Sequence, residues 1–341
     1  MTLLGRLAQW LTNRLDEAGR SPHDRPLRFH FGSRDLVVGG AAEQMRRVET
    51  RGLWPATGRR PELGLTILPA EALCELPDCS GLRRGSYGCI IDADTARGVR
   101  PPLELAPWLV CLEPERGFLL AYDPDRRAAL LVPGRAVAPR EHAEFCRPLL
   151  HWAAIADGHV LLHAAAVVRG DRGLVVAGAG RAGKTTLVRA CLAAGFEYLG
   201  DNVVELDAAT AGRAVWGVYP TLKVRPGGPE FPRRETAAVA WDDQARKEIH
   251  FLGGPQGVGF RPLVADHTAT LVLTENGPAE LAPVAAATAF FATAPNTIAQ
   301  FPFFQAAAFS RLRLVSERAA TYTAGRLPLA RIAEHVERLV A

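Results

Sequence analysis

The residues with the clearest chemical meaning form a glycine-rich segment in the middle of the chain. Residues 178–185 are Gly-Ala-Gly-Arg-Ala-Gly-Lys-Thr, which fits the phosphate-binding pattern G-x-x-x-x-G-K-[ST] at every fixed position. Glycines let backbone N–H groups surround phosphate oxygens without interference from a Cβ atom. In this pattern Lys184 reaches the β- and γ-phosphates, and Thr185 offers its hydroxyl to Mg²⁺. The segment therefore predicts binding of a nucleoside triphosphate together with Mg²⁺.

The segments on either side of the glycines favour the same interpretation. The apolar run 173–177 predicts a buried strand, and the run 186–194 predicts a helix that Gly195 would end. The N-terminus of such a helix carries roughly half a positive charge, which attracts phosphate. We expect ATP to contact the whole loop and the first helical residues: Gly178, Ala179, Gly180, Arg181, Ala182, Gly183, Lys184, Thr185 and Thr186.

The composition narrows the class of protein and the partners. The chain has 341 residues, of which 48% are hydrophobic and 22% charged, as is typical of a globular protein with about two domains. The net charge is only +4, and no dense Lys/Arg run is interleaved with aromatic residues, so nucleic acid is not an expected partner. No apolar run reaches the roughly 18 residues that a membrane span needs. We therefore expect a cytoplasmic location; the oligomeric state stays open, a homo-oligomer included.

The cysteines and the N-terminal segment favour the same compartment. None of the six cysteines forms a C-x-x-C pair or a Cys/His spacing typical of zinc, so all are predicted to be free thiols in a reducing environment. Residues 1–15 place leucines on one helical face, but charged residues interrupt the segment and no cleavage site follows it. We interpret it as a helix that packs on the protein or on a partner, with a membrane-surface helix as the alternative.

The pattern along the chain predicts two regions, residues 1–150 and 151–341. After the N-terminal helix, the first region is rich in short apolar runs separated by turn signals, which predict strands at 63–68, 88–91, 108–112, 117–122 and 129–132. A helix at 139–156, with a kink at Pro148, would lead into the second region. There we expect strands at 164–168, 173–177, 203–206, 219–225 and 269–273, and a C-terminal helix at 329–339.

Three segments of the second region together resemble a known family. They are His163 with the apolar residues after it, the glycine-rich motif, and residues 195–202, Gly-Phe-Glu-Tyr-Leu-Gly-Asp-Asn. This combination resembles the catalytic core of the HPr kinase/phosphorylase family and its HPr-kinase-related members, whose fold is similar to that of phosphoenolpyruvate carboxykinase. The resemblance covers about residues 159–207. It implies an α/β P-loop catalytic domain, preceded here by a β-rich region that does not resemble the family's regulatory domain.

The resemblance implies roles for individual residues. Asp201 matches the first aspartate of the family's acidic pair, which is expected to take the proton of the acceptor hydroxyl, and it precedes an apolar run. His163 matches a histidine near the phosphates, and Lys184 is expected to act in catalysis as well as in binding. Thr185, Asp201 and Asn202 are the expected Mg²⁺ ligands. Asn202 departs from the family's second aspartate, so this position lacks a negative charge.

These features lead to a function with two alternatives. The first expectation is an ATP-dependent kinase that phosphorylates a hydroxyl, with serine as the expected residue, on a peptide, a protein or a small metabolite. A biosynthetic precursor peptide is one acceptor that the resemblance suggests. The alternatives are an ATP-binding module without transfer activity, which Asn202 favours, and a P-loop hydrolase. A turn residue is the structural alternative for Asp201, and a core histidine is the alternative for His163.

Two charged segments beyond the motif stay ambiguous at this stage. Lys223 and Arg225 alternate along an expected strand, so both side chains would project from one face, toward phosphate, toward an acidic substrate or simply toward solvent. The pair Asp242-Asp243, close to Lys247, is interpreted as an exposed loop and not as a metal site.

Overall fold

The chain forms a mixed α/β structure that divides into two compact units. The computed structural model describes residues 1–20, 26–40, 54–55, 61–91, 100–134, 138–208, 214–226, 236–252, 265–325 and 327–340. The first unit consists of Met1–Thr50, Pro55–Ala156 and Phe301–Gln305, and the second of Arg51–Trp54, Asp157–Gln300 and Ala306–Ala341. The expected boundary after residue 150 lies inside α4, a helix of the first unit.

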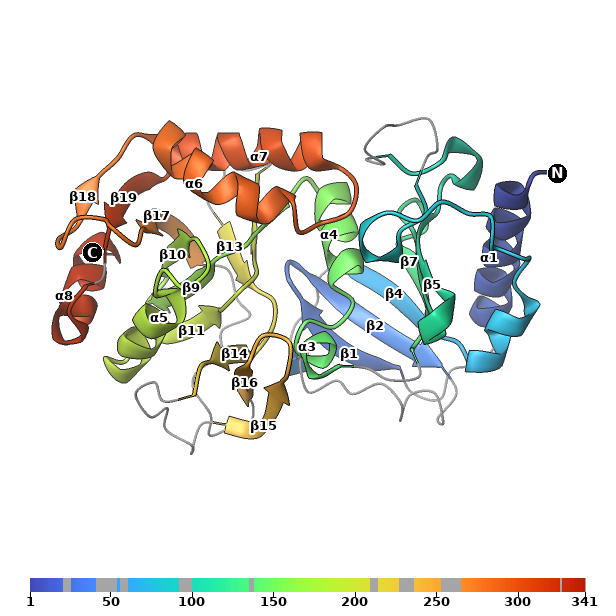
Figure 1. Ribbon diagram of the computed structural model, residues 1–341, viewed down its shortest axis with the longest axis horizontal. Coiled ribbons are helices and arrows are strands. Elements are labelled where there is room, and N and C mark those ends of the chain that lie inside the picture. Colours follow the sequence, from blue (N-terminus) through green and yellow to red (C-terminus); the bar gives the residue numbers. More distant parts are fainter. Residues whose placement is uncertain are drawn as a thin grey trace. The chain divides into compact units, whose positions relative to one another are not determined.

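The first unit is built on a seven-stranded mixed sheet with the strand order β3-β1-β2-β4-β7-β6-β5 (Figure 1). The pairs β2–β4 and β4–β7 are parallel, whereas β1–β2, β5–β6 and β6–β7 are antiparallel. Its elements are α1 (Leu3–Arg20), β1 (Leu27–Phe31), β2 (Arg34–Gly40), β3 (Trp54–Pro55), β4 (Glu62–Ile67), β5 (Leu109–Glu113), β6 (Phe118–Asp123), β7 (Ala128–Val132), α3 (Pro139–Ala143) and α4 (Arg147–Ala156).

The N-terminal helix α1 packs onto this unit. Leu7 and Leu11 are fully buried in a core cluster with Trp108 and side chains of the sheet, and Thr12 accepts a hydrogen bond from the Trp108 indole at 3.2 Å. The expectation of a packed helix is confirmed. Within the described residues, no helix combines the length and the apolar character needed to cross a bilayer.

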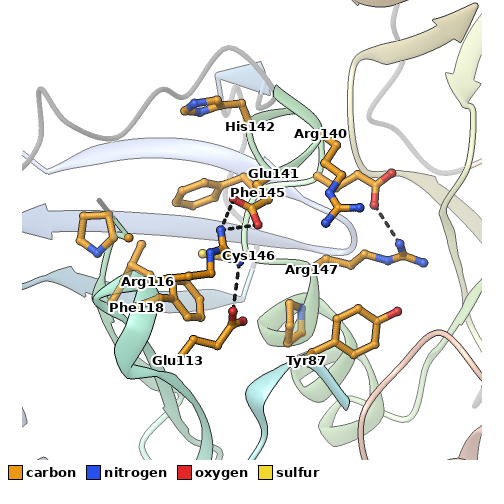
Figure 2. Close-up of a pocket in the computed structure, with 15 residues that line it drawn as sticks. Tyr87, Glu113, Arg116, Phe118, Arg140, Glu141, His142, Phe145, Cys146 and Arg147 are labelled. Atoms are coloured by element: carbon orange, nitrogen blue, oxygen red, sulfur yellow. Dashed lines mark hydrogen bonds and ion pairs between the residues drawn. The ribbon is translucent and has the colours of Figure 1, made fainter. Parts of the chain in front are cut away.

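A pocket of about 430 Å³ opens in the first unit, where α3 and the start of α4 face β5–β7 (Figure 2). Two of its arginines, Arg116 and Arg147, contact glutamates of the pocket. Arg116 donates to both carboxylate oxygens of Glu141 at 2.6 Å and to Glu113 at 3.2 Å. Arg147 donates to Glu144 at 2.9 Å. Phe118 and Leu131 are among the apolar residues of the wall.

The second unit contains a nine-stranded sheet, whose main path has the order β11-β9-β10-β17-β13-β12-β8, and a separate three-stranded sheet, β14-β16-β15. The elements are β8 (Val160–Leu162), β9 (Ala165–Arg169), β10 (Arg172–Gly178), α5 (Lys184–Ala193), β11 (Glu197–Gly200), β12 (Val204–Leu206), β13 (Ala214–Gly217), β14 (Thr221–Val224), β15 (Thr236–Asp242), β16 (Lys247–Leu252), β17 (Ala265–Leu273), β18 (Ala282–Pro283), α6 (Ala286–Ile298), α7 (Gln305–Arg318), β19 (Ala320–Ala324) and α8 (Leu329–Val340).

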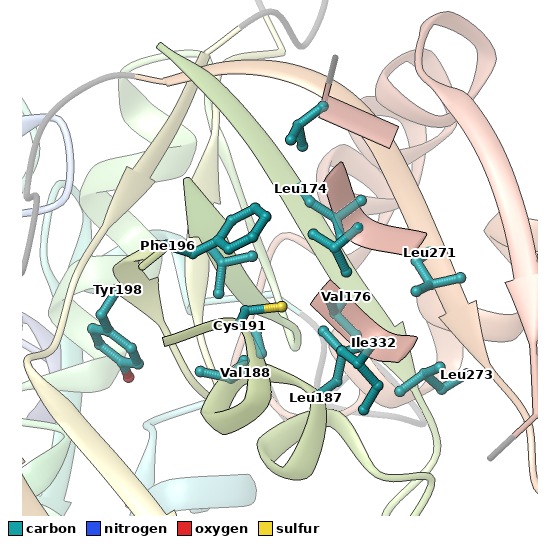
Figure 3. Close-up of a cluster of buried hydrophobic side chains, with 14 of the residues drawn as sticks. Leu174, Val176, Leu187, Val188, Cys191, Phe196, Tyr198, Leu271, Leu273 and Ile332 are labelled. Atoms are coloured by element: carbon teal, nitrogen blue, oxygen red, sulfur yellow. The ribbon is translucent and has the colours of Figure 1, made fainter. Parts of the chain in front are cut away.

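Helices α5 and α8 bury one face of the larger sheet. Figure 3 shows Leu187 and Val188 of α5 and Ile332 of α8 beside Val176 of β10 and Leu271 of β17. All five side chains are at most 3% exposed. The helix predicted at the C-terminal segment is confirmed as α8. Leu222 of β14 belongs to the same core, so the small sheet is fixed against the large one.

Three local expectations in the first unit are wrong. Residues 88–91 do not form a strand: Gly88 ends a short 3₁₀ helix, and Cys89 and Ile90 form only isolated bridges. The helix expected at 139–156 is two helices, α3 and α4, because the chain breaks between them and Cys146 has a φ of 50°. Pro148 lies in the first turn of α4, where its missing N–H costs little. By contrast, the strands expected at 117–122 and 129–132 are confirmed as β6 and β7, which pair antiparallel.

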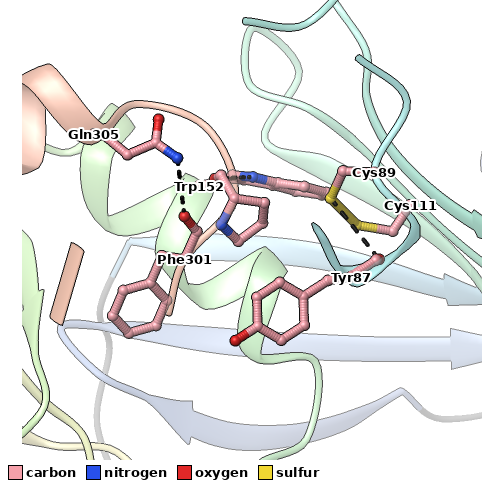
Figure 4. The surroundings of a disulfide bond; sticks show 7 residues. Tyr87, Cys89, Cys111, Trp152, Phe301 and Gln305 are labelled. Carbon is pink, nitrogen blue, oxygen red and sulfur yellow. Dashed lines mark hydrogen bonds between the residues drawn. A yellow bond between two sulfur atoms is a disulfide. The ribbon is translucent and has the colours of Figure 1, made fainter. Parts of the chain in front are cut away.

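The expectation that all cysteines are free thiols is also wrong. Cys89 and Cys111 form a disulfide, which Figure 4 shows beside Tyr87. An isolated antiparallel bridge pairs the two residues, so their Cα atoms lie 3.9 Å apart. They are 22 residues apart in the sequence, and only the folded sheet brings them together. Cys74, Cys79, Cys146 and Cys191 are free thiols.

Candidate active site

The glycine-rich motif connects a buried strand to a helix, as expected. Strand β10 ends at Gly178, residues 179–183 form the loop, and α5 begins at Lys184. Gly178 has a φ of +143°, and a Cβ atom there would lie 2.4 Å from the carbonyl oxygen of Leu273. Only glycine fits at this position, because the parallel strand β17 runs directly alongside. The N-terminus of α5 therefore faces the loop, an arrangement that favours an anion.

The individual loop residues differ in what they can offer a nucleotide. The Lys184 ammonium group lies across the loop and donates to the carbonyl oxygens of Gly178 and Ala179, at 2.8 and 3.2 Å. Burial lowers the pKa of Lys184, and the charge of Asp201 opposes that shift. The Ala182 side chain belongs to the hydrophobic core, so this residue can offer only its backbone. The exposed residues are Ala179, Gly180 and Arg181 of the motif and Thr186 directly after it.

The strand order explains how Asp201 reaches the loop. Strand β9 pairs antiparallel with both β10 and β11. These two strands therefore run in the same direction and end at the same edge of the sheet. Strand β10 leads into the glycine loop at this edge, and β11 leads directly into Asp201. Asp201 was expected only to precede an apolar run; it also directly follows a strand, β11, that was not predicted.

Asp201 is almost completely buried, and polar groups from two elements surround its carboxylate. The Thr185 hydroxyl donates to it, at 3.2 and 3.3 Å from the two oxygens. The backbone N–H of Lys223 donates to Oδ2 at 3.3 Å. Burial raises the pKa of Asp201, while the Lys223 N–H, the charges of Lys247 and Lys184 and the Thr185 hydroxyl act in the opposite direction. A carboxylate with a raised pKa is a stronger proton acceptor than an ordinary one.

The small sheet adds cations to this edge. Strands β14 and β16 are antiparallel, with Lys223 opposite Ile249 and Val224 opposite Glu248. Lys247 is close enough to Asp201 for each charge to shift the pKa of the other. The sequence left the direction of Lys223 and Arg225 open and made no prediction for Lys247 itself. Lys247 begins β16 and is only partly exposed.

The Asp242-Asp243 pair divides between two environments. Asp242 ends β15 opposite Lys247 and is 6% exposed, contrary to the expectation of an exposed loop. Its Oδ1 accepts the N–H groups of Gln244 and Ala245, both at 3.1 Å, so the side chain closes the β15–β16 turn. Asp243 is exposed, as expected.

His163 and Asn202 lie at the same edge of the sheet. Strand β9 begins at Ala165, and its Ala166 is opposite Gly200 of β11, so the residues before β9 lie near the end of β11. The Asn202 N–H donates to Ala164 at 3.1 Å, and Asn202 has a φ of 104°, which asparagine tolerates better than most residues. The His163 N–H donates to the Thr297 hydroxyl of α6 at 3.0 Å. The fold thus brings both residues near Asp201, and their chemical roles stay predictions.

The oxygens of Asp201 and Thr185 suit a hard divalent cation. Mg²⁺ is usually bound by one or two protein carboxylates, with water and substrate phosphates as the other ligands. A carboxylate and a hydroxyl already within 3.3 Å of each other beside a phosphate loop fit that requirement. Asn202 is adjacent in sequence, and its amide oxygen is a further candidate. Among the described residues, no three or more His, Cys, Asp and Glu side chains form a group suited to a metal ion.

No protein-family model matches the chain, and no curated protein is significantly similar to it in sequence.

Proposed function

We propose that this chain is an ATP-dependent kinase that transfers the γ-phosphoryl group to a hydroxyl, with serine as the expected acceptor, on a peptide, a protein or a small metabolite. One observation carries the proposal. The Asp201 carboxylate, which has a raised pKa, lies beside Thr185 of a complete phosphate-loop motif. Phosphoryl transfer needs a fixed and neutralised triphosphate, and a base within reach of the acceptor hydroxyl.

Different residues would bind the phosphates, neutralise their charge and accept the proton. Backbone N–H groups of the loop and the N-terminus of α5 would bind the phosphates, and Lys184 would leave its two carbonyl partners to neutralise the β- and γ-phosphates. Mg²⁺, when bound, would supply positive charge to the same phosphates. Asp201 would accept the proton of the hydroxyl as its oxygen bonds to the γ-phosphorus. The bond between that phosphorus and the bridging oxygen breaks, and ADP leaves with the electron pair.

The test begins with ATP binding. Lys184→Ala should weaken Mg·ATP binding by about 100-fold or more, because a charged partner of the phosphates is lost. Asp171→Asn, in the turn at the opposite end of β10, is a matched control that should bind normally. Calorimetric titration of the three proteins measures the effect. Equal affinity of Lys184→Ala and the parent would show that the loop is not a nucleotide site.

Transfer is tested separately. The parent protein is incubated with Mg²⁺, γ-labelled ATP and a library of serine-containing peptides, and label on peptide, on free phosphate and on ATP is counted. Label on peptide supports the kinase. Release of phosphate without transfer supports a hydrolase instead.

A second candidate is an ATP-binding module without transfer activity, which the presence of Asn202 in place of an acidic residue favours. Asn202→Asp should then be informative, because a charged oxygen binds Mg²⁺ more strongly than an amide oxygen does. If the chain is a kinase, the variant should need less Mg²⁺ for half-maximal transfer. If neither protein transfers label while both bind ATP, the module is the better description.

A further inference from the structure

Lys247 is a cation near the phosphate loop that the loop motif does not account for. The chain has only three lysines, Lys184, Lys223 and Lys247, and uses arginine at every other strongly basic position. Lys184 belongs to the motif, and Lys223 donates its backbone N–H to Asp201. Lys247 has no part in the transfer as proposed above. Its ammonium group is a compact point charge, whereas a guanidinium is a wide planar fork. Lys247 therefore brings a second compact cation, besides Lys184, to the site.

The register of the small sheet places Lys247 on the same face as Lys223. Lys223 of β14 is opposite Ile249 of β16, and Lys247 is two residues before Ile249. Residues directly opposite each other in a sheet share a face, and so do residues two apart along a strand. Strand β14 is also the strand that contacts the proposed base, because the Lys223 N–H donates to Asp201 at 3.3 Å. Lys247 thus begins the strand next to the one that holds Asp201.

Two contacts of β14 fix the small sheet beside the phosphate loop. The Tyr198 hydroxyl of β11 donates to the carbonyl oxygen of Thr221 at 2.5 Å, which joins β14 to the strand that leads into Asp201. Leu222 is fully buried in the core that also contains Leu187 of the loop helix α5. Strand β16 pairs with β14 over four residues. Lys247 therefore starts from a fixed position relative to the loop and the base.

The Lys247 side chain is partly buried, and within the described part of the chain its ammonium group has no hydrogen bond and no ion pair. Asp242 is opposite Lys247 in the register, but its Oδ1 accepts the N–H groups of the β15–β16 turn. Burial lowers the pKa of Lys247, the charge of Asp201 opposes this shift, and the charges of Lys223 and Arg225 add to it. A partly buried ammonium group without a direct partner is costly, and such groups are found mainly where a ligand completes them.

Lys247 is close to both groups that would face the γ-phosphate. Burial raises the pKa of Asp201, and the Lys223 N–H and then the charge of Lys247 lower it. Burial lowers the pKa of Lys184, Asp201 opposes that shift, and the charge of Lys247 adds to it. In the loop motif the lysine reaches the β- and γ-phosphates, and the base must lie beside the hydroxyl that attacks the γ-phosphorus. A cation near both Lys184 and Asp201 is therefore near the γ-phosphoryl group.

We propose that Lys247 is a second lysine ligand of the triphosphate and binds the γ-phosphoryl group that is transferred. The inference rests on the proposed kinase function and adds a catalytic residue to it. Lys184 would neutralise the β- and γ-phosphates from the loop, and Lys247 would neutralise the γ-phosphate oxygens from the small sheet. During transfer these oxygens carry the negative charge of the phosphoryl group, so a fixed cation beside them stabilises the transition state. ADP lacks this group and would leave Lys247 without its ligand.

The test compares two nucleotides that differ in the γ-phosphate. Calorimetric titration of the full chain, in the presence of Mg²⁺, measures its affinity for ADP and for a non-hydrolysable ATP analogue. Lys247→Met should weaken binding of the analogue by about tenfold or more, as the loss of one charge-assisted hydrogen bond predicts, and leave the affinity for ADP unchanged. Arg246→Met, one residue earlier in the exposed turn, is the matched control and should change neither affinity.

The possible results separate the two proposals. If the parent binds the analogue and Lys247→Met binds both nucleotides as the parent does, Lys247 acts at most through Asp201, and the inference is wrong. If the variant loses affinity for both nucleotides equally, the effect does not come from the γ-phosphate, and the inference is again wrong. The kinase proposal is unaffected in both cases. If the parent does not bind the analogue, the proposed function itself fails. Lys247→Gln gives the same comparison should Lys247→Met not fold.

Discussion

The pocket of the first unit and the phosphate-loop edge of the second unit differ in how their charged side chains are paired. In the pocket each arginine of a pair contacts its glutamate directly, Arg116 with Glu141 at 2.6 Å and Arg147 with Glu144 at 2.9 Å. At the edge, Lys184 donates to carbonyl oxygens, and Asp201 accepts from a hydroxyl and an amide N–H. Lysine and aspartate there influence each other's pKa without this direct pairing.

This difference is consistent with the proposed function, which assigns the chemistry to the phosphate-loop edge. Paired charges on a pocket wall satisfy one another and hold the wall in place. Buried charges with shifted pKa values cost stability, and proteins retain them mainly where they act. The pocket therefore says less about the function of the protein than the phosphate-loop edge does, although it is a clear cavity.

The largest expected effect is on catalysis. Asp201→Asn removes the proton acceptor and keeps the shape of the side chain, so transfer should fall by about 10²–10⁴-fold while ATP still binds. Asn202 is already neutral, so no neighbouring carboxylate in this turn can replace the lost one. The measurement is the rate of label transfer to an accepted peptide at saturating ATP, with binding measured on the same samples. If the variant transfers label as fast as the parent does, Asp201 is not the base and is only a turn residue.

A smaller effect on stability, of opposite sign, should accompany the loss of transfer. Because the folded-state pKa of Asp201 is raised above its ordinary value of 3.8, the charged form is disfavoured in the folded protein. The contribution of this group to stability is therefore complete below that ordinary value and is lost as the pH rises through the raised pKa. Asp201→Asn avoids the loss, so it should melt a few degrees higher than the parent at neutral to alkaline pH.

Thermal melts of both proteins at about pH 4 and about pH 8 check this prediction. The advantage of Asp201→Asn should shrink toward the acidic end, where the parent carboxyl is protonated as well. A variant that is less stable than the parent at both pH values would mean that the hydrogen bonds to Asp201 outweigh its burial, and that the contrast between the two regions is weaker than the structure indicates.

Local signals predicted the loop and its flanking elements well. The motif, the strand before it and the helix after it depend on residues close in sequence, so glycine spacing and apolar runs were sufficient. Strand β11 was missed because it has only four residues, Glu197–Gly200, and one of them is glycine. The approach of Asp201 to Thr185 depends on the pairing of β9 with two strands, which no local pattern encodes. Asp201 was predicted as a candidate site residue only from the resemblance to a kinase family.

The strand face that carries Lys223 and Arg225 is an example of what local sequence patterns do not predict. The alternation along 219–225 placed Lys223 and Arg225 on one face of a strand. It does not predict which residues of other strands lie beside that face. Lys247 joins them only through the register of β14 with β16, and Asp242 only through β15. The signal that could have found Lys247 was the turn at 243–246, which predicts a hairpin with Asp242 and Lys247 opposite each other. The disulfide was missed for the same reason, because its two cysteines meet only across a sheet.

The smallest expected effect concerns the first unit and tests whether its pocket charges are structural. Glu141 accepts two hydrogen bonds from Arg116 and one from the Ala138 N–H, which precedes the first turn of α3. Glu141→Ala removes all three, so we expect a loss of about 1 kcal/mol in the free energy of unfolding, the usual value of a helix cap together with a partly exposed ion pair. ATP affinity should not change.

The matched control is Glu115→Gln, which alters the more exposed pair with Arg84 and should leave stability as it is. Denaturant unfolding and calorimetry on the same preparations supply both quantities. If Glu141→Ala weakens ATP binding or transfer while the protein stays folded, the pocket charges take part in function, and the contrast between a structural pocket and a chemical edge no longer holds.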